Sequence, residues 1–92
     1  MNKVDQGTLK CVIAQGTIEA VLAALPERVG AENIREVRPG AVLVHTALEP
    51  AELRDWLSTQ VGAGGSLLVF EFEKWSGFGG AVDREWLLAR GH

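Results

Sequence analysis

In this 92-residue chain, the order in which helix-type and strand-type patterns of apolar residues follow one another constrains the fold more than any other feature. Apolar side chains recur at helical spacing in two stretches, residues 18–29 and 50–61. Each stretch stands between segments of β-type pattern, which gives the order strand, helix, strand, strand, helix, strand. A chain of this length can bury one hydrophobic core and not two. We therefore expect a single domain over residues 8–92, with residues 1–7 flexible and a C-terminal tail at 76–92.

Four segments predict β-strands: residues 8–15, 32–38, 41–46 and 67–75. The first is apolar on nearly both sides, which is typical of a central strand. The second carries so much charge that it suits a sheet edge. Pro39-Gly40 then predicts a type II turn, because proline fixes φ and glycine accepts a positive φ. Residues 32–38 and 41–46 should therefore form a hairpin.

Local signals predict where the helices begin and end. Thr17 is the expected N-cap of the first helix, and Pro26 should end or bend that helix. Pro50 suits the first position of the second helix, with Glu52 placed to accept hydrogen bonds from free amides. Asp83 should cap a short final helix that contains Trp86 and Leu87.

Right-handed crossovers in this order predict an α+β, ferredoxin-like βαββαβ sandwich. Its four-stranded antiparallel sheet would carry two helices on one face, with the short C-terminal helix as an addition. We expect Leu68, Phe70 and Phe72 to point inward under the helices. The uncovered face should then present a mixed set of side chains: Lys10, Val12, Ala14, Val69, Glu71, Glu73 and Trp75.

A mixed, half-apolar sheet face commonly supports a homodimer. The predicted partner-binding residues are Val12, Val69, Trp75 and Phe78. The glycine-rich stretch before the last helix would let the tail reach across to the second subunit. Trp75 and Trp86 are expected to pin that tail to the domain.

Charge and composition restrict the classes of partner. The net charge is −3, and no run of Lys or Arg exceeds one residue, which disfavours binding to nucleic acid. The polar start lacks the hydrophobic stretch of a signal peptide, and no apolar run is long enough for a bilayer. The single cysteine, Cys11, excludes an internal disulfide and a cysteine-rich zinc site. We expect a cytoplasmic protein without membrane association.

Several segments of the C-terminal half resemble a known family. They are 40–46 (GAVLVHT), 48–55 (LEPAELRD), 66–70 (SLLVF), 75–78 (WSGF) and 86–87 (WL). They look like the uncharacterised bacterial proteins called the SinR family, small ferredoxin-like relatives of the CRISPR-associated endonuclease of spacer adaptation. The resemblance spans about the last fifty residues. It implies a fold and a homodimer rather than an activity.

The same resemblance implies a catalytic residue that this chain lacks. The enzymatic relatives place an aspartate at the end of the first strand, where two copies are thought to hold a metal ion. No Asp or Glu occurs between Gln6 and Ile18, and Ala14, Gln15 and Gly16 occupy the corresponding positions. An amide cannot supply the negative charge that a hard divalent cation requires. We therefore expect no metal site and no inherited nuclease activity.

The remaining candidates for chemistry are His45, Glu71 and Glu73. His45 is the one internal histidine, although a lone histidine in a strand is more often a hydrogen-bonded side chain than a catalyst. Glu71 and Glu73 project to one side of a strand, as a carboxylate pair would, but a solvated polar face gives the same pattern. Cys11 on an apolar face is typical of a small buried hydrophobe.

Three hypotheses of different class remain. The first is a non-enzymatic homodimeric interaction module that needs no cofactor. The second is a metal-dependent nuclease, or a nucleic-acid-binding protein, that uses Glu71 and Glu73 in place of the missing aspartate. The third is a small-molecule-binding dimer with a concave pocket at the dimer interface, lined by Trp75 or Phe78.

Overall fold

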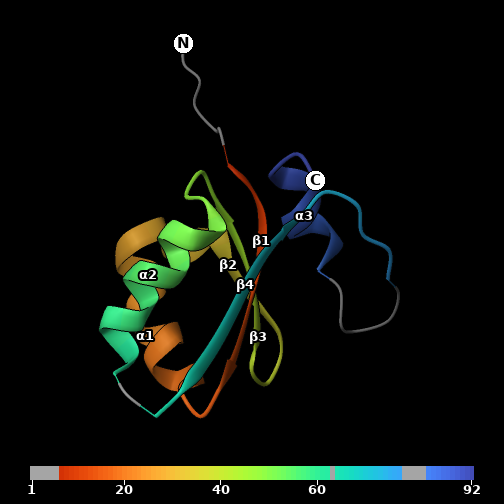
Figure 1. The fold of residues 1–92 in the computed structure, drawn as a ribbon. Helices are drawn as coiled ribbons and strands as arrows, with labels where there is room; N and C mark the ends of the chain where they lie inside the picture. Colours follow the sequence, from red (N-terminus) through yellow and green to blue (C-terminus); the bar gives the residue numbers. More distant parts are fainter. Residues whose placement is uncertain (1–6, 63, 78–82) are drawn as a thin grey trace.

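A computed structural model describes residues 7–62, 64–77 and 83–92 (Figure 1). The predicted flexible segment therefore lies almost wholly outside the described residues, as does Phe78. The elements are, in chain order, β1 (Thr8–Gln15), α1 (Ile18–Val29), the 3₁₀ turn η1 (Ala31–Asn33), β2 (Ile34–Arg38), β3 (Ala41–Thr46), α2 (Pro50–Val61), β4 (Ser66–Phe72) and α3 (Arg84–Ala89). No helix in these ranges is long and apolar enough to span a membrane.

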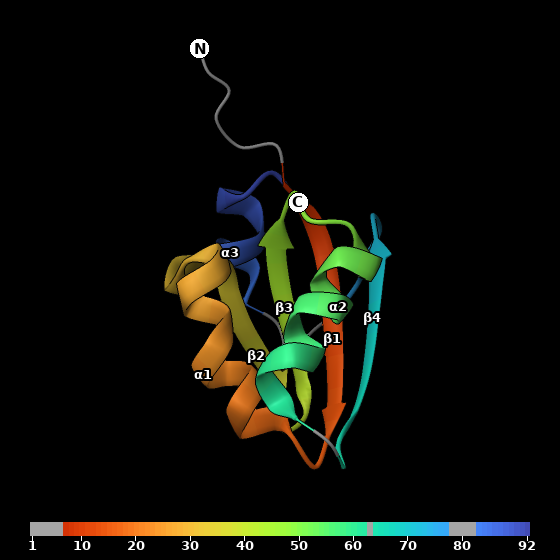
Figure 2. The same cartoon turned by 60° about the vertical axis from the view of Figure 1, so that its left-hand side comes forward.

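The strands form one antiparallel sheet in the order β2-β3-β1-β4. Both helices α1 and α2 cover one face of this sheet, and α3 lies on the other (Figures 1 and 2). This is the ferredoxin-like α+β arrangement that the order of elements predicts. Strands β1 and β3 are central, whereas β2 and β4 are the edges.

Most predicted helix boundaries are confirmed. Glu49 and Glu52 form a capping box at the start of α2, with the Glu49 amide donating to Glu52 Oε1 at 2.9 Å. The Asp83 side chain caps α3 by accepting from the Trp86 amide at 3.1 Å. Thr17 occupies the N-cap of α1, but its hydroxyl makes no capping hydrogen bond.

Three boundaries differ from those predicted. Helix α1 continues through Pro26 to Val29, because one missing amide costs a single hydrogen bond while Val29 still packs on the core. Strand β4 ends at Phe72 rather than at residue 75, because its pairing with β1 extends no further than Phe72 opposite Leu9. Residues 31–33 form the turn η1, so β2 begins at Ile34 rather than at residue 32.

The main core lies between the sheet and helices α1 and α2. Its buried members are Val12, Ala14, Val21, Leu25, Val42, Val44, Leu53 and Leu57. Strands β1 and β3 contribute their even-numbered residues, and the partly buried Leu67 and Val69 of β4 extend the same face. Because side chains alternate along a strand, the odd residues of β1 and β3 face the opposite way.

The sequence-based prediction of which sheet face the helices cover is wrong, and the two faces are exchanged. Val12 is fully buried under the helices and Val69 packs against the same core, so neither belongs to an uncovered face. Leu68 and Phe70, expected to point inward, are 56% and 40% exposed. Both sides of β1 and β4 are rich in apolar residues, so alternation alone does not say which side meets the helices.

Candidate functional site

The face of the sheet opposite α1 and α2 carries the candidate functional site, and we call it the open face. The register places in one layer Leu9, Cys11 and Ile13 of β1; Ala41, Leu43 and His45 of β3; and Leu68, Phe70 and Phe72 of β4. The short helix α3 covers one end of this layer (Figure 1). Its Trp86 and Leu87 are buried against Leu9 in a second, smaller core.

Polar contacts hold α3 on the open face. The Trp86 indole donates to the carbonyl oxygen of Glu32 at 2.7 Å, and the Trp75 indole donates to that of His92 at 3.4 Å. The prediction that these two tryptophans pin the tail is therefore confirmed. Arg35 of β2 binds Asp83 through Nε and Oδ2 at 3.0 Å, so the start of α3 is tied to the sheet edge.

The other end of the open face is bare and apolar. Ile13, Leu68 and Phe70 are 41%, 56% and 40% exposed, and we call these three residues the apolar patch. Ile13 and Leu68 are direct partners across β1 and β4. Cys11 lies beside them, paired with Phe70, and is 8% exposed. Burial raises the pKa of the Cys11 thiol, which keeps it in the unreactive protonated form at neutral pH.

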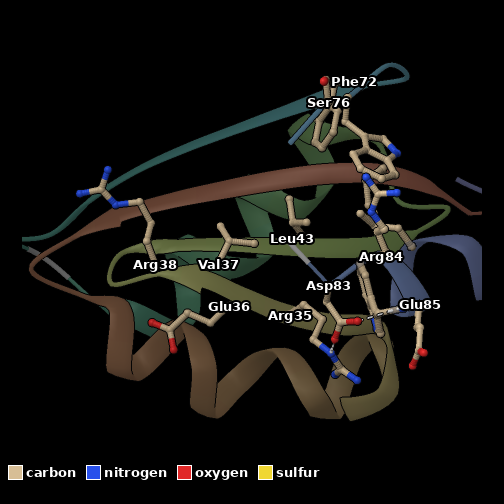
Figure 3. A pocket seen from close by; sticks show the side chains of 14 residues that line it. Arg35, Glu36, Val37, Arg38, Leu43, Phe72, Ser76, Asp83, Arg84 and Glu85 are labelled. Carbon is tan, nitrogen blue, oxygen red and sulfur yellow. Dashed lines mark hydrogen bonds and ion pairs between the residues drawn. The ribbon is translucent and has the colours of Figure 1, made fainter. Parts of the chain in front are cut away.

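A cleft of about 700 Å³ lies between the sheet and α3 and extends to the β2 edge (Figure 3). Its apolar lining comes from the sheet and from the tail: Leu9, Val37, Leu43, Phe72, Trp75, Trp86 and Leu87. Its charged residues are Arg35, Glu36, Arg38, Asp83, Arg84 and Glu85. Trp75 lines this cleft, which lies within one chain, whereas the pocket predicted for Trp75 was at a dimer interface.

An irregularity in β2 supplies part of this lining. The register runs from Glu36 opposite Val42 directly to Arg38 opposite Ala41, so Val37 is the extra residue of a β-bulge. In a regular strand Arg38 would share the helix-covered face with Glu36. The bulge instead places Arg38 on the side of Ala41, which belongs to the open face.

Asp83 stands at the edge of the cleft with a stabilised negative charge. The hydrogen bond from the Trp86 amide lowers the pKa of its carboxyl most, and the hydrogen bond from Arg35 lowers it further. The same carboxylate therefore caps α3 and binds the sheet edge. It is ionised at neutral pH.

The residues predicted for catalysis do not come together. His45 is buried on the open face, where its Nδ1 lies 2.8 Å from Nε2 of His92. Glu71 pairs with Lys10 across the strands and so belongs to the opposite, helix-covered face. Its Oε1 lies 3.3 Å from Nζ of Lys10 and accepts from the Thr8 hydroxyl at 3.1 Å.

Glu73 is exposed and follows the end of β4. Strand β4 ends one residue before Glu73, so the strand does not place Glu73 on the same side as Glu71. In the parts of the chain that the structure describes, no three His, Cys, Asp or Glu side chains gather as ligands for one metal ion.

Two features of this region were not predicted from the sequence. Lys10 is 1% exposed, and its ammonium also donates to the Thr46 carbonyl at 2.8 Å. An isolated lysine in an otherwise apolar strand was the available signal for a buried, bonded cation. The placement of Arg38 on the open face depends on the bulge, and no residue type indicates a bulge in a strand this polar.

No protein-family model matches the chain, and neither the curated proteins nor the solved structures include one with significant similarity to it.

Proposed function

We propose that the protein is a non-enzymatic homodimeric interaction module in which two copies associate through their open faces. The observation that carries this proposal is the exposed apolar patch, Ile13, Leu68 and Phe70, on a sheet face that α3 covers at one end only. Contiguous exposed apolar surface in a small domain favours association. The resemblance to the SinR family, whose members are expected to dimerise, supports the same proposal.

A second copy is the occupant that the chemistry of the patch favours. A two-fold interface brings the same surface of each subunit together, so the surface must be complementary to itself. A charged patch would repel its own copy, whereas these three apolar side chains and the neighbouring Cys11 and Ala41 carry no charge. With a net charge of −3, the remaining surface repels a second copy only weakly.

The test is the oligomeric state of the full chain at micromolar concentration, measured by sedimentation velocity. We expect a dimer for the natural sequence and a monomer for Phe70→Asp, because the substitution would bury a carboxylate against its own copy. Leu88→Asp is the matched control, since Leu88 on α3 is 65% exposed and lies outside the patch. A monomeric natural protein, or dissociation by Leu88→Asp alone, would contradict the proposal.

A cleavage assay tests the alternative, a metal-dependent nuclease. We expect no cleavage of RNA or duplex DNA with magnesium or manganese. The physical reason is that Glu71 already binds the Lys10 ammonium, while His45 lies across the sheet from it. Metal-dependent cleavage that Glu71→Gln abolishes would refute the non-enzymatic function.

A further inference from the structure

We propose that the cleft between the sheet and α3 binds an elongated organic anion that has an apolar body and an acidic group at each end. The cleft volume of about 700 Å³ lies within the range of small-molecule sites, which is roughly 300–1,000 Å³. Every residue in the argument belongs to one chain, so this site does not depend on the proposed dimer.

The apolar middle of the cleft would hold the body of the ligand. Val37 and Leu43 form its floor on β2 and β3, and Phe72, Trp75 and Trp86 stand beside it. The guanidinium groups of Arg35 and Arg90 lie 5.6 and 4.8 Å from the centre of the Trp86 ring, so this indole is already held in place. Rigid aromatic and branched side chains offer contact area with little loss of side-chain entropy.

The charges at the cleft are unevenly compensated. Arg35 and Asp83 bind each other at 3.0 Å and neutralise one another. Arg38 and Arg84 have no ion-pair partner among the described residues. In Figure 3, the carboxylates of Glu36 and Glu85 point away from Leu43, Arg38 extends across the strands on one side of Leu43, and Arg84 lies on the other side.

The two arginines stand at opposite ends of the cleft. Arg38 reaches over the sheet from the end of β2, and Arg84 lies at the α3 end, where Phe72 and Ser76 also line the cleft (Figure 3). A guanidinium binds carboxylate or phosphate groups through paired hydrogen bonds. Two guanidinium groups separated by an apolar floor match a ligand with two separated acidic groups better than a ligand with one acidic group.

The β2 bulge gives this arrangement a structural basis. Without it, Arg38 would point to the helix-covered face with Glu36, and one end of the cleft would lose its cation. Bulges are frequent beside binding sites because they redirect a side chain. Here the redirected side chain is Arg38, which together with Arg84 gives the cleft a cation at each end.

The probes are decanedioate, decanoate and 1,10-decanediol, which share an apolar chain and differ in charge. Binding is followed by the indole N–H resonances in ¹H-¹⁵N spectra of the full chain. We expect saturable shifts of Trp75 and Trp86 with decanedioate, and none of Trp56, which packs on the helix side of the sheet. Removal of one acidic group from the ligand should weaken binding about tenfold, so decanoate should bind less tightly than decanedioate, and decanediol least.

Arg38→Gln and Arg84→Gln should each weaken decanedioate binding about tenfold while leaving decanoate binding within a few fold. Arg28→Gln is the matched control, because Arg28 lies over Trp56 on the other side of the sheet. Equal affinity for decanedioate and decanediol, or an unchanged affinity in both variants at the cleft, would overturn the proposal. An effect of only one of the two arginines would refute the two-ended ligand.

The dimer and the cleft can fail separately. Phe70→Asp, which should abolish dimerisation, lies outside the cleft and should leave decanedioate binding within twofold of the natural protein. Loss of decanedioate binding in this variant, with its spectrum otherwise unchanged, would show that the site needs the second copy. The independent, single-chain site would then be wrong.

Discussion

Lys10 shows how a single charged residue is accommodated in a small core. Its side chain runs along the helix-covered face beyond the apolar cluster, and its ammonium reaches the Thr46 carbonyl, the Thr8 hydroxyl and Glu71. A buried ammonium without such partners would cost several kcal/mol, on the order of the penalty for one desolvated ion. Glu71 therefore has a structural partner, and a second role as a metal ligand or catalytic base would leave that ammonium uncompensated.

We expect Glu71→Gln to lower the free energy of unfolding by about 1 kcal/mol, which is below the usual range for a charged hydrogen bond because the carboxylate is partly exposed. Urea denaturation measures the change.

Lys10→Met should lower the free energy of unfolding less than Lys10→Ala, because methionine keeps the buried stem of the side chain. A double variant, Lys10→Met with Glu71→Gln, should cost less than the sum of the single changes, and strict additivity would contradict the pairing.

The pH dependence of α3 docking follows from Asp83. Because its pKa is lowered in the folded protein, its contribution is present above the unfolded pKa, about 3.9, and is lost as pH falls through the folded value. We expect the Trp86 indole resonance to shift in this acid range. Asp83→Asn keeps a capping acceptor and should remove the titration. An unchanged acid titration in Asp83→Asn would assign it to another group.

At the scale of elements, the β2-β3 hairpin decides the shape of the site. Its turn needs a positive φ at Gly40, which is 87°, and the carbonyl of Gly40 accepts from the Ala14 amide at 2.8 Å. The turn chemistry of Pro39-Gly40 could be predicted from the sequence. The bulge three residues earlier could not, because its register depends on how β2 meets the rest of the sheet.

Gly40→Ala should destabilise the protein more than Gly16→Ala. Both glycines have a positive φ, 87° and 79°, so a side chain is strained at either position by roughly 1–2 kcal/mol. Only at Gly40 would the new Cβ also lie 3.0 Å from a backbone atom, the Ala14 carbonyl oxygen. Urea denaturation of the two variants compares them, and an equal loss of stability would show that this crowding has no effect.

At the scale of the whole molecule, one sheet separates two apolar clusters of unequal size. The larger lies under α1 and α2, and the smaller lies under α3, where Leu9, Trp86 and Leu87 are its buried members. The smaller cluster leaves the apolar patch uncovered. A second copy would complete the burial that α3 begins.

The proposed dimerisation should be visible in the thermal stability of the whole protein. A dimer that dissociates on unfolding has a Tm that rises with protein concentration. We expect such a rise for the natural sequence over about a hundredfold range, and a constant Tm for Phe70→Asp. Differential scanning calorimetry gives both values. A Tm independent of concentration in the natural protein would argue for a monomer.

The sequence by itself determined the order of elements, the ferredoxin-like fold, the caps at Glu52 and Asp83, and the turn at Gly40, because these depend on neighbours within a few residues. Only the tertiary structure decided which face of the sheet meets the helices. Both faces of β1 and β4 are apolar, so the choice depends on the joint packing of α1, α2 and α3. Only the tertiary structure decided the cleft as well, because Arg38 comes from the β2 bulge and Arg84 from α3, which are far apart in sequence.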